Sequence, residues 1–316
     1  MAILQALDIF TLLNALPSAI AQGLIWGIMA IGVFITYKVL DVADLTVDGT
    51  MCTGAAVSIM MILAGYNIWL AMFCAFIAGA IAGLITGILH TKMGIPALLA
   101  GILTQLSLYS INLKIMGKAN QAISVDNYDL IVSSRYLFDS SSAWYQSPIL
   151  IVGIMTVVVI AALYWFFGTE LGCALRATGA NENMARAQGI NTNVNKVLGL
   201  MISNGLVAFS SALYAQYQGF SDINMGRGAI VIGLAAVIIG DVIFSKIFQN
   251  FALKLLSVSI GAIIYYIVLQ VVLWRGLDSD YLKLLSAVIV AIFLAIPYWK
   301  AQYFSKPVKK GETTNA

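Results

Sequence analysis

Pro148-Ile-Leu-Ile-Val-Gly-Ile-Met-Thr-Val-Val-Val-Ile-Ala-Ala-Leu-Tyr-Trp-Phe-Phe167 is a continuous stretch without a charged side chain. Inside a bilayer every backbone polar group must find its partner within the chain, so an apolar run of about 20 residues forms a membrane-spanning helix. The rest of the chain agrees, with 61% hydrophobic and 10% charged residues and a mean hydropathy of +0.93. A soluble domain could not cover so much apolar surface with polar groups. The sequence therefore predicts an all-α, polytopic membrane protein.

Nine segments along the 316 residues have the length and hydropathy of a span. They are 16–38, 49–65, 67–90, 95–116, 148–167, 196–217, 228–246, 250–272 and 281–299. The second and seventh are short, so each can enter the membrane as a partial helix. Residues 2–13 can lie along the interface or add a further partial span. We expect about nine transmembrane helices, between eight and ten, in a single transmembrane domain over residues 1–316.

The distribution of Lys and Arg sets the orientation, because cytoplasmic loops are enriched in them. Placing the tail 300–316 in the cytoplasm leaves eleven of these residues inside and six outside. The loop 168–196 is then cytoplasmic and the loop 117–147 extracytoplasmic. Residues 1–16 carry Asp8 but no Lys or Arg, so they lack the basic region of a cleavable signal peptide and are expected to remain in the mature protein.

Two segments share a pattern that indicates an inverted repeat. Gly49-Thr-Met-Cys-Thr-Gly54 has the same glycine spacing as Gly228-Ala-Ile-Val-Ile-Gly233, and each follows a span and an acid-bearing loop. Such matches also arise by chance in a chain rich in Gly and Ala. The predicted topology places the two loops on opposite sides of the membrane, as in transporters whose pathway lies at a repeat interface.

The sequence lacks the common motifs of catalysis and nucleotide binding. The chain has no Gly-x-x-x-x-Gly-Lys-Ser/Thr loop, no His-Glu-x-x-His and no Gly-x-Ser-x-Gly. Its three cysteines are far apart and fit no metal or redox spacing, and its scattered basic residues favour no nucleic-acid partner. We expect no enzyme activity and no cofactor, and any drive by ATP must come from another subunit.

Polar residues in or beside the spans are candidates for a translocation pathway, because they are costly in hydrocarbon. The candidates are Asp44, Thr46, Asp48, Asn204, Asp222, Asn224 and Asp241. The alternative is that such groups form hydrogen bonds between helices and hold the bundle together.

The polar insert 168–196 has the signals of short helices. Glu170–Ala177 can form one, Thr178-Gly179 is expected to interrupt it, and Asn181 is a suitable N-cap for a second that ends at Gly189. Met184, Ala185 and Ala187 would give this second helix a small apolar surface that suits a groove in a partner. An ordinary connecting loop is the alternative.

The residues Leu171 to Asn191, in the pattern Leu-Gly-x-x-Leu-Arg-Ala-x-Gly-x-Asn-x-x-x-Ala-x-x-x-Gly-Ile-Asn, resemble a known cytoplasmic coupling loop. It is the loop of permease subunits in the branched-chain amino-acid and ribose branch of ATP-binding cassette (ABC) importers. Three further segments, 41–50, 90–104 and 109–117, resemble a subgroup linked to tryptophan or tyrosine uptake. The resemblance covers roughly residues 15–300. The segment 41–50 departs from the branched-chain members, which argues against a leucine-type substrate.

The resemblance implies a permease of the bacterial inner membrane that forms a homodimer. Each copy would dock on a cytoplasmic ATPase, and an extracytoplasmic binding protein would deliver a small solute such as an aromatic amino acid. The implied coupling residues are Arg176, Gly179, Asn181, Glu182, Met184, Ala185, Arg186 and Gly189. The alternative function is an ion-coupled secondary transporter that works without an ATPase.

Overall fold

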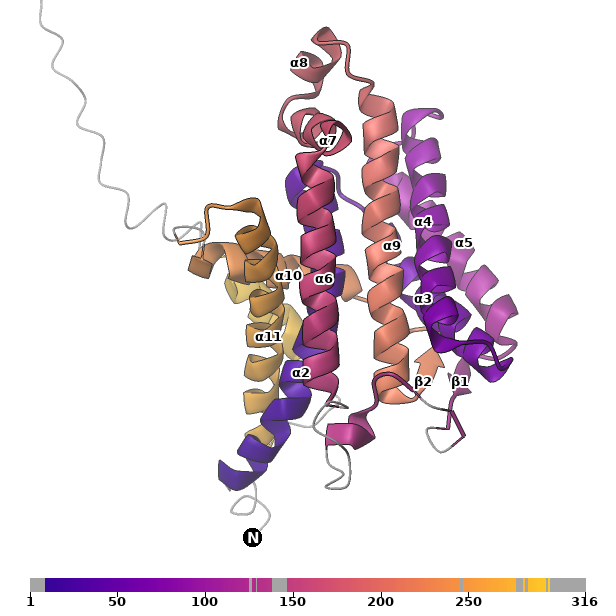
Figure 1. Cartoon of the computed structure of the whole chain (residues 1–316), viewed down its shortest axis with the longest axis vertical. Helices are drawn as coiled ribbons and strands as arrows, with labels where there is room; N and C mark the ends of the chain where they lie inside the picture. The colour runs from indigo at the N-terminus through magenta and orange to yellow at the C-terminus, as the bar shows by residue number, and fades with distance from the viewer. Residues whose placement is uncertain are drawn as a thin grey trace, which may run out of the picture.

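The computed structural model describes residues 9–124, 127, 128, 130–137, 147–244, 247–276, 281, 284–293 and 295 (Figure 1). Its helices are α2 (Ile9–Phe34), which continues into the π-helical turn η1 (Ile35–Val39), α3 (Thr46–Leu63), α4 (Ile68–Thr91), α5 (Ala97–Met116), α6 (Pro148–Gly168), α7 (Glu170–Ala180), α8 (Glu182–Ala187), α9 (Thr192–Gln218), α10 (Ala229–Phe244) and α11 (Phe251–Trp274). A short 3-10 helix, η2, covers Ser134–Leu137. The tail 300–316 lies outside the described residues.

The nine predicted spans all coincide with helices. Seven described helices are long and apolar enough to cross a membrane, and two shorter apolar helices, Ala229–Phe244 and Leu284–Phe293, fall within the seventh and ninth predicted spans. The remainder of 281–299 is outside the described residues, apart from Tyr281 and Ala295. Residues 9–13, for which an interfacial or separate segment was considered, continue directly into α2. The polytopic all-α prediction is therefore confirmed.

Three helices form the interior of the bundle. In the most apolar 18-residue stretch of each helix, the share of buried residues is 83% for α2 with η1, 72% for α3 and 67% for α9. The same share is 33% for α4 and 28% for α5 and α6. Figure 1 shows α9 between α6 and α4, with α10 and α11 beyond α2. The polar residues of α3 and α9 are therefore largely shielded from lipid, and side chains such as Asn204, Ser203 and Ser210 form hydrogen bonds within the bundle.

Glycine brings the central helices close together. A Cβ atom at Gly79 of α4 would meet the carbonyl oxygen of Asn204 in α9, and one at Gly83 would meet that of Leu200. Small residues let helices pack closely where the surrounding hydrocarbon supplies no hydrophobic driving force. The close approach of α4 to α9 places α9 within reach of the polar side chains of α3.

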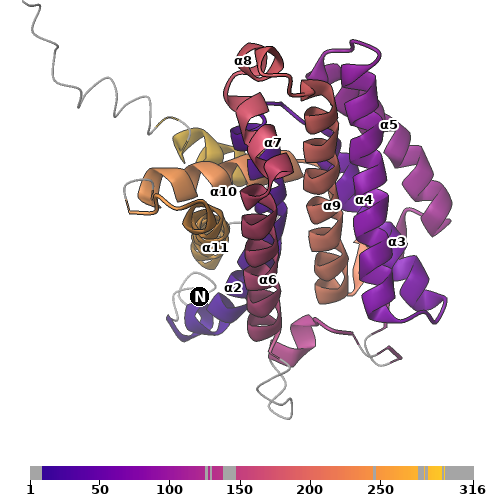
Figure 2. The same ribbon diagram turned by 45° about the horizontal axis from the view of Figure 1, so that its top comes forward.

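The two halves of the chain run in opposite directions. In Figure 1, α2 rises toward the end that carries α7 and α8, whereas α9 descends from that end to strand β2 (Phe220–Asp222). Strand β2 pairs antiparallel with β1 (Asn120–Ala122), which follows α5. The chain thus enters α3 from the end that carries α7 and α8 and enters α10 from the β2 end, and α10 lies at a steep angle to α6 and α9 (Figure 2).

The predicted break at Thr178-Gly179 is wrong, because α7 continues through both residues to Ala180. The Thr178 hydroxyl donates to the carbonyl of Ala174 at 2.8 Å and accepts from Asn195 Nδ2 at 3.1 Å. Gly179 packs directly against the carbonyl of Val39. Threonine here stabilises the helical turn, and glycine serves close packing, so neither residue ends the helix.

Candidate functional site

A chain of hydrogen bonds runs through the interior of the bundle. Asp44, in the loop before α3, accepts from the backbone N–H of Thr46 at 2.9 Å and from Asn204 Nδ2 at 2.7 Å. The Asn204 Oδ1 atom accepts from the hydroxyl of Thr50 at 2.7 Å. The hydroxyl of Thr46 lies 2.7 Å from that of Thr86 in α4. These hydrogen bonds join α3, α4, α9 and the loop before α3.

Asp48, one turn further along α3, holds the start of α10. Its carboxylate oxygens accept from the backbone N–H groups of Gly228 at 2.9 Å and Ile230 at 3.0 Å. A carboxylate at this position pairs the open N–H groups of the first turn and suits the positive end of the helix dipole. The first turn of α3 therefore contacts the first turn of α10 in the interior of the bundle.

A cavity of about 270 Å³ lies beside this meeting point. We call it the central cavity. Its walls come from α3, α5 and the segment before α10, and the lining residues are Asp48, Gly49, Cys52, Gln105, Leu106, Tyr109, Asn112, Ile223 and Arg227. The volume is just below the range of about 300–1,000 Å³ that holds small-molecule ligands. The cavity combines an acid, a base, an aromatic ring and two amides in a space suited to one small solute.

One polar atom in the wall of the central cavity has no hydrogen-bond partner. Asn112 is fully buried, and its Nδ2 donates to the carbonyl of Gly49 at 3.4 Å, but Oδ1 is without a partner among the described residues. A buried polar atom without a partner costs about 1–3 kcal/mol.

Gln105, Tyr109, Asn112 and Arg227 were not among the predicted pathway residues. Gln105, Tyr109 and Asn112 are spaced four and three residues apart, so they share one face of α5, and that spacing was a usable signal. Arg227 gave no such signal. It reaches the central cavity only because Asp48 fixes the start of α10 against α3.

The other predicted pathway residues lie at the two ends of the bundle. Asp222 and Asn224 form a turn at the β2 end, where the N–H of Asn224 donates to Asp222 Oδ1 at 2.7 Å. Asp241 lies in the last turns of α10 and forms an ion pair with Lys38 at 3.2 Å, with its side chain 49% exposed. The structure therefore brings Asp44, Thr46 and Asn204 together and puts Asp48 at the central cavity. Asp222 and Asn224 lie on either side of Ile223, which lines that cavity, whereas Asp241 lies apart from it in the last turns of α10.

Helix α8 forms the tip of the molecule at the end expected to face the cytoplasm (Figure 1). Asn181 caps it by accepting from the N–H of Met184 at 3.0 Å, and it ends before Gly189, whose φ is +81°. This part of the prediction is confirmed. Met184 is 60% exposed, whereas Ala185 is buried at 2% and anchors the helix.

Glu182 ties α8 to the start of α9. Its carboxylate accepts from Arg186 at 2.6 Å and from Lys196 at 2.8 Å. The hydrogen bond from Lys196 is the largest cause of a lowered pKa at Glu182. Arg186 is engaged within the chain, and it also donates to the hydroxyl of Thr192 at 2.9 Å.

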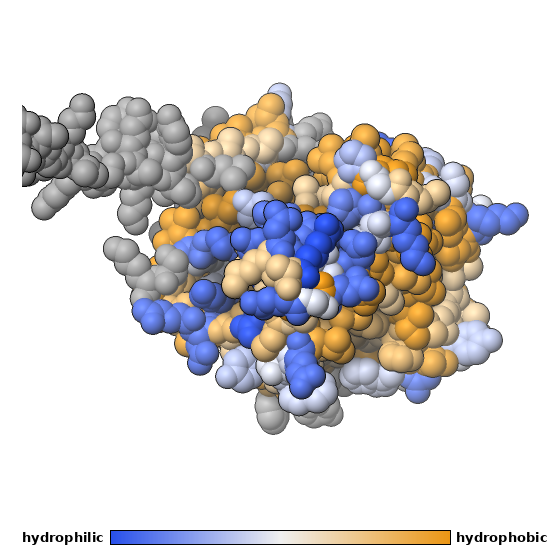
Figure 3. Space-filling model, turned by 90° about the horizontal axis from the view of Figure 1, so that it is seen from above, coloured by the Kyte–Doolittle hydropathy of each residue, from blue (hydrophilic) through white to orange (hydrophobic). Residues whose placement is uncertain are grey.

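Two other predicted coupling residues, Arg176 and Gly179, belong to α7 and line a separate cavity beneath it. Viewed from the end that carries α7 and α8, hydrophilic residues gather in the middle of the face and hydrophobic ones surround them (Figure 3). The exposed residues of this polar face include Asn181, Asn183, Arg186 and Gln188. Such a face, rising beyond the apolar helices, can contact a soluble protein.

Comparisons with known proteins agree on the class of the chain. Residues 16–297 match the family described as "Branched-chain amino acid transport system / permease component". The chain is 40% identical over 283 residues to a "Tyrosine transport system permease protein" of Clostridioides difficile (strain R20291), which covers 90% of this chain and 91% of that protein. It is 39% identical over 285 residues to an uncharacterized protein of Rickettsia prowazekii (strain Madrid E), and the match covers 90% of this chain and 98% of that protein.

More distant matches point the same way. A 198-residue stretch, 61% of this chain and 53% of its relative, is 28% identical to the "Autoinducer 2 import system permease protein LsrC" of Yersinia pestis (strain Pestoides F). The fold resembles a chain in the structure "PsaBC from Streptococcus pneumoniae in complex with Fab", with a TM-score of 0.54 and 16% sequence identity. The match covers 93% of this chain and 100% of that chain. The similarity to the tyrosine permease fits the subgroup indicated by segments 41–50, 90–104 and 109–117. The chain therefore belongs to the family of branched-chain amino acid transport system permease components, and it is a multi-pass permease of an ABC transport system in the bacterial inner membrane.

Proposed function

We propose that this permease carries an aromatic amino acid inward through the central cavity. The observation that supports this most is the set of groups in the cavity wall: the acid Asp48, the base Arg227 and the ring of Tyr109. An amino acid is a zwitterion, so its ammonium group suits Asp48 and its carboxylate suits Arg227. Tyr109 supplies an aromatic face for the side chain.

The partners follow from the family and from the shape of the chain. An ATPase would dock on α8 from the cytoplasm, and a binding protein would deliver the amino acid from the other side. A second copy of the chain would face α5, whose apolar window is only 28% buried although one of its faces lines the central cavity. Transport proceeds by alternating access. ATP and the binding protein each shift the equilibrium only by binding one conformation more tightly than the other.

Replacing Arg227 tests the proposal. In proteoliposomes that contain the permease with its ATPase and binding protein, R227Q should lower the rate of tyrosine or tryptophan uptake by about tenfold, because a charged hydrogen bond contributes about 1.5–3 kcal/mol. R227K retains the charge and should keep part of the rate. Uptake of labelled amino acid with ATP inside the vesicles is the measurement.

The matched control is R275Q, which removes the same charge from an exposed arginine that follows α11. It should transport at the wild-type rate. Equal rates for R227Q and wild type would remove the central cavity from the pathway. Uptake driven by an ion gradient through the lone chain would instead favour a secondary transporter.

A further inference from the structure

A second cavity lies under α7, at the end of the molecule expected to face the cytoplasm. We call it the basal cavity. Its volume is about 290 Å³, and its walls come from the end of α2, η1, α7, α10 and the start of α11. The larger apolar residues in these walls are Phe34, Val39, Val237, Phe251 and Val258. Because it lies where the spanning helix α2 ends and the spanning helix α11 begins, we place it at the depth of the lipid headgroups.

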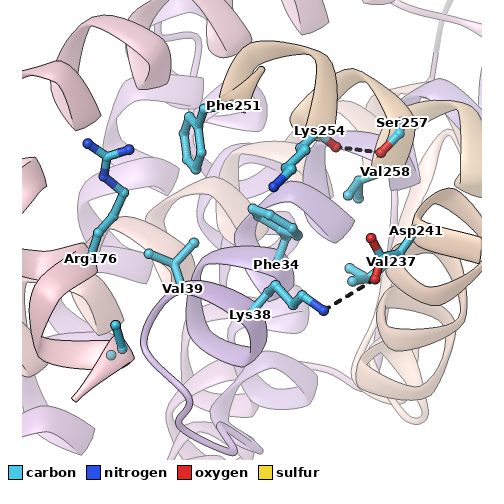
Figure 4. A pocket seen from close by; sticks show the side chains of 12 residues that line it. Phe34, Lys38, Val39, Arg176, Val237, Asp241, Phe251, Lys254, Ser257 and Val258 are labelled. Carbon is cyan, nitrogen blue, oxygen red and sulfur yellow. Dashed lines mark hydrogen bonds and ion pairs between the residues drawn. The ribbon is translucent and has the colours of Figure 1, made fainter. Parts of the chain in front are cut away.

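The polar lining of the basal cavity is strongly basic. Lys38, Arg176 and Lys254 reach it from η1, α7 and α11, and Asp241 is the one acid among the lining residues (Figure 4). Asp241 is paired with Lys38 at 3.2 Å. Throughout the described part of the chain, neither Arg176 nor Lys254 forms an ion pair. Two positive charges are thus left without a counter-charge at the rim of an apolar cavity.

Arg176 also connects this cavity to the outer surface of the bundle. Its guanidinium lies over the ring of Phe251, 5.8 Å from the centroid. Both residues line a neighbouring hollow of about 520 Å³ that continues past Tyr164 and Trp165 at the end of α6. Trp165 is 74% exposed and Tyr164 is 50% exposed. Exposed aromatic residues at the end of a span are typical of the membrane interface, so the two hollows together open toward lipid.

We propose that the basal cavity binds the headgroup of an anionic phospholipid. The phosphate contacts Arg176 and Lys254, neither of which forms an ion pair with another described residue. The glycerol region lies against Phe34 and Phe251, and the acyl chains leave past Tyr164 and Trp165 along α6. Basic pockets between helices on the cytoplasmic side are suited to such headgroups. An acidic segment of a docked protein would satisfy the same charges, but the apolar lining and the opening toward α6 favour a lipid.

The test measures lipid binding to the full-length purified chain by native mass spectrometry. Phosphatidylglycerol and phosphatidylcholine with the same acyl chains are titrated separately. The wild-type chain should bind phosphatidylglycerol more tightly than phosphatidylcholine. The variant R176Q/K254Q should lose about 30-fold in phosphatidylglycerol affinity, from about fivefold for each cation, whereas R176K/K254R should retain most of it because both charges remain.

The matched control is K114Q/K118Q, which removes two exposed lysines near the end of α5 on the opposite side. Its affinity for phosphatidylglycerol should equal that of wild type. Three results would overturn the proposal: unchanged affinity in R176Q/K254Q, equal loss in the control, or displacement of the lipid by inorganic phosphate, which would indicate a site for free anions. Loss of ATPase association in R176Q/K254Q with unchanged lipid affinity would assign these cations to protein docking instead.

Discussion

Asp44 and Asn204 illustrate how a buried acid is accommodated within a membrane protein. Asp44 is 3% exposed and Asn204 fully buried, and each of the two Asp44 oxygens accepts a hydrogen bond. A charge in a dry interior is expensive unless its hydrogen bonds are made. Asn204 also donates to the carbonyl of Leu200 at 3.0 Å, so the same amide holds both the acid and its own helix. The pair therefore fixes the loop before α3 against α9.

Substitutions of Asp44 should separate loss of charge from loss of hydrogen bonding. D44N can keep part of the network, because the Asn204 amide can turn, accept from the new amide and donate to the hydroxyl of Thr50. Turning gives up the hydrogen bond to the carbonyl of Leu200. D44L leaves the N–H of Thr46 without a partner and should destabilise the chain by about 2 kcal/mol. Thermal unfolding of the purified permease should thus place D44N between wild type and D44L. Equal midpoints for D44N and D44L would show that the hydrogen bonds contribute nothing.

Among the elements, hydropathy identified the long helices and local chemistry identified the caps, but packing between distant segments was not visible in the sequence. The spans were predicted because every apolar run in hydrocarbon must become a helix, and the Asn181 cap because its signal is local. Thr178-Gly179 was misread as a break, since its helical role depends on Asn195 and Val39. Arg227 was missed for the same reason: its position depends on a contact between Asp48 and α10.

The attachment of α8 to α9 should depend on pH through Glu182. Its pKa is below the ordinary value of 4.5, chiefly because Lys196 donates to it. A group with a lowered pKa contributes its full stabilisation above the ordinary value and loses it as the pH falls through the lowered value. Hydrogen exchange of the amides of residues 182–188, normalised to an unstructured peptide of the same sequence, should therefore accelerate only below about pH 4.5.

The control for this prediction is E182Q, which keeps the shape of the side chain and removes its charge. Its normalised exchange should already be fast at neutral pH and should change little on acidification. A wild-type profile that is flat below pH 4.5, or one that E182Q reproduces, would show that the ion pairs with Arg186 and Lys196 do not hold α8.

At the scale of the whole molecule, interior helices connect the central cavity to helix α8. The hydrogen-bond network of Asp44 and Asn204 lies in the same interior helices, α3 and α9, that connect the two regions. Helix α9 begins beside α8 and ends beside β2, so a displacement of α8 would be transmitted along α9 toward the opposite end (Figure 1). Rigid packed helices with paired interior polar groups transmit such movements better than mobile loops.

The docking of a partner on α8 can be tested at the level of the complete assembly. Met184 is 60% exposed at the tip of the molecule, and M184D would put a charge into any apolar contact made there. When the permease is purified from membranes that contain the ATPase, M184D should lose the co-purifying ATPase while its thermal midpoint stays at the wild-type value. The matched control is M93D, which changes a methionine, 66% exposed, in the loop between α4 and α5 at the same end. M93D should retain the ATPase, and equal loss in both variants would show a general effect of charge on this face, with no specific role for α8.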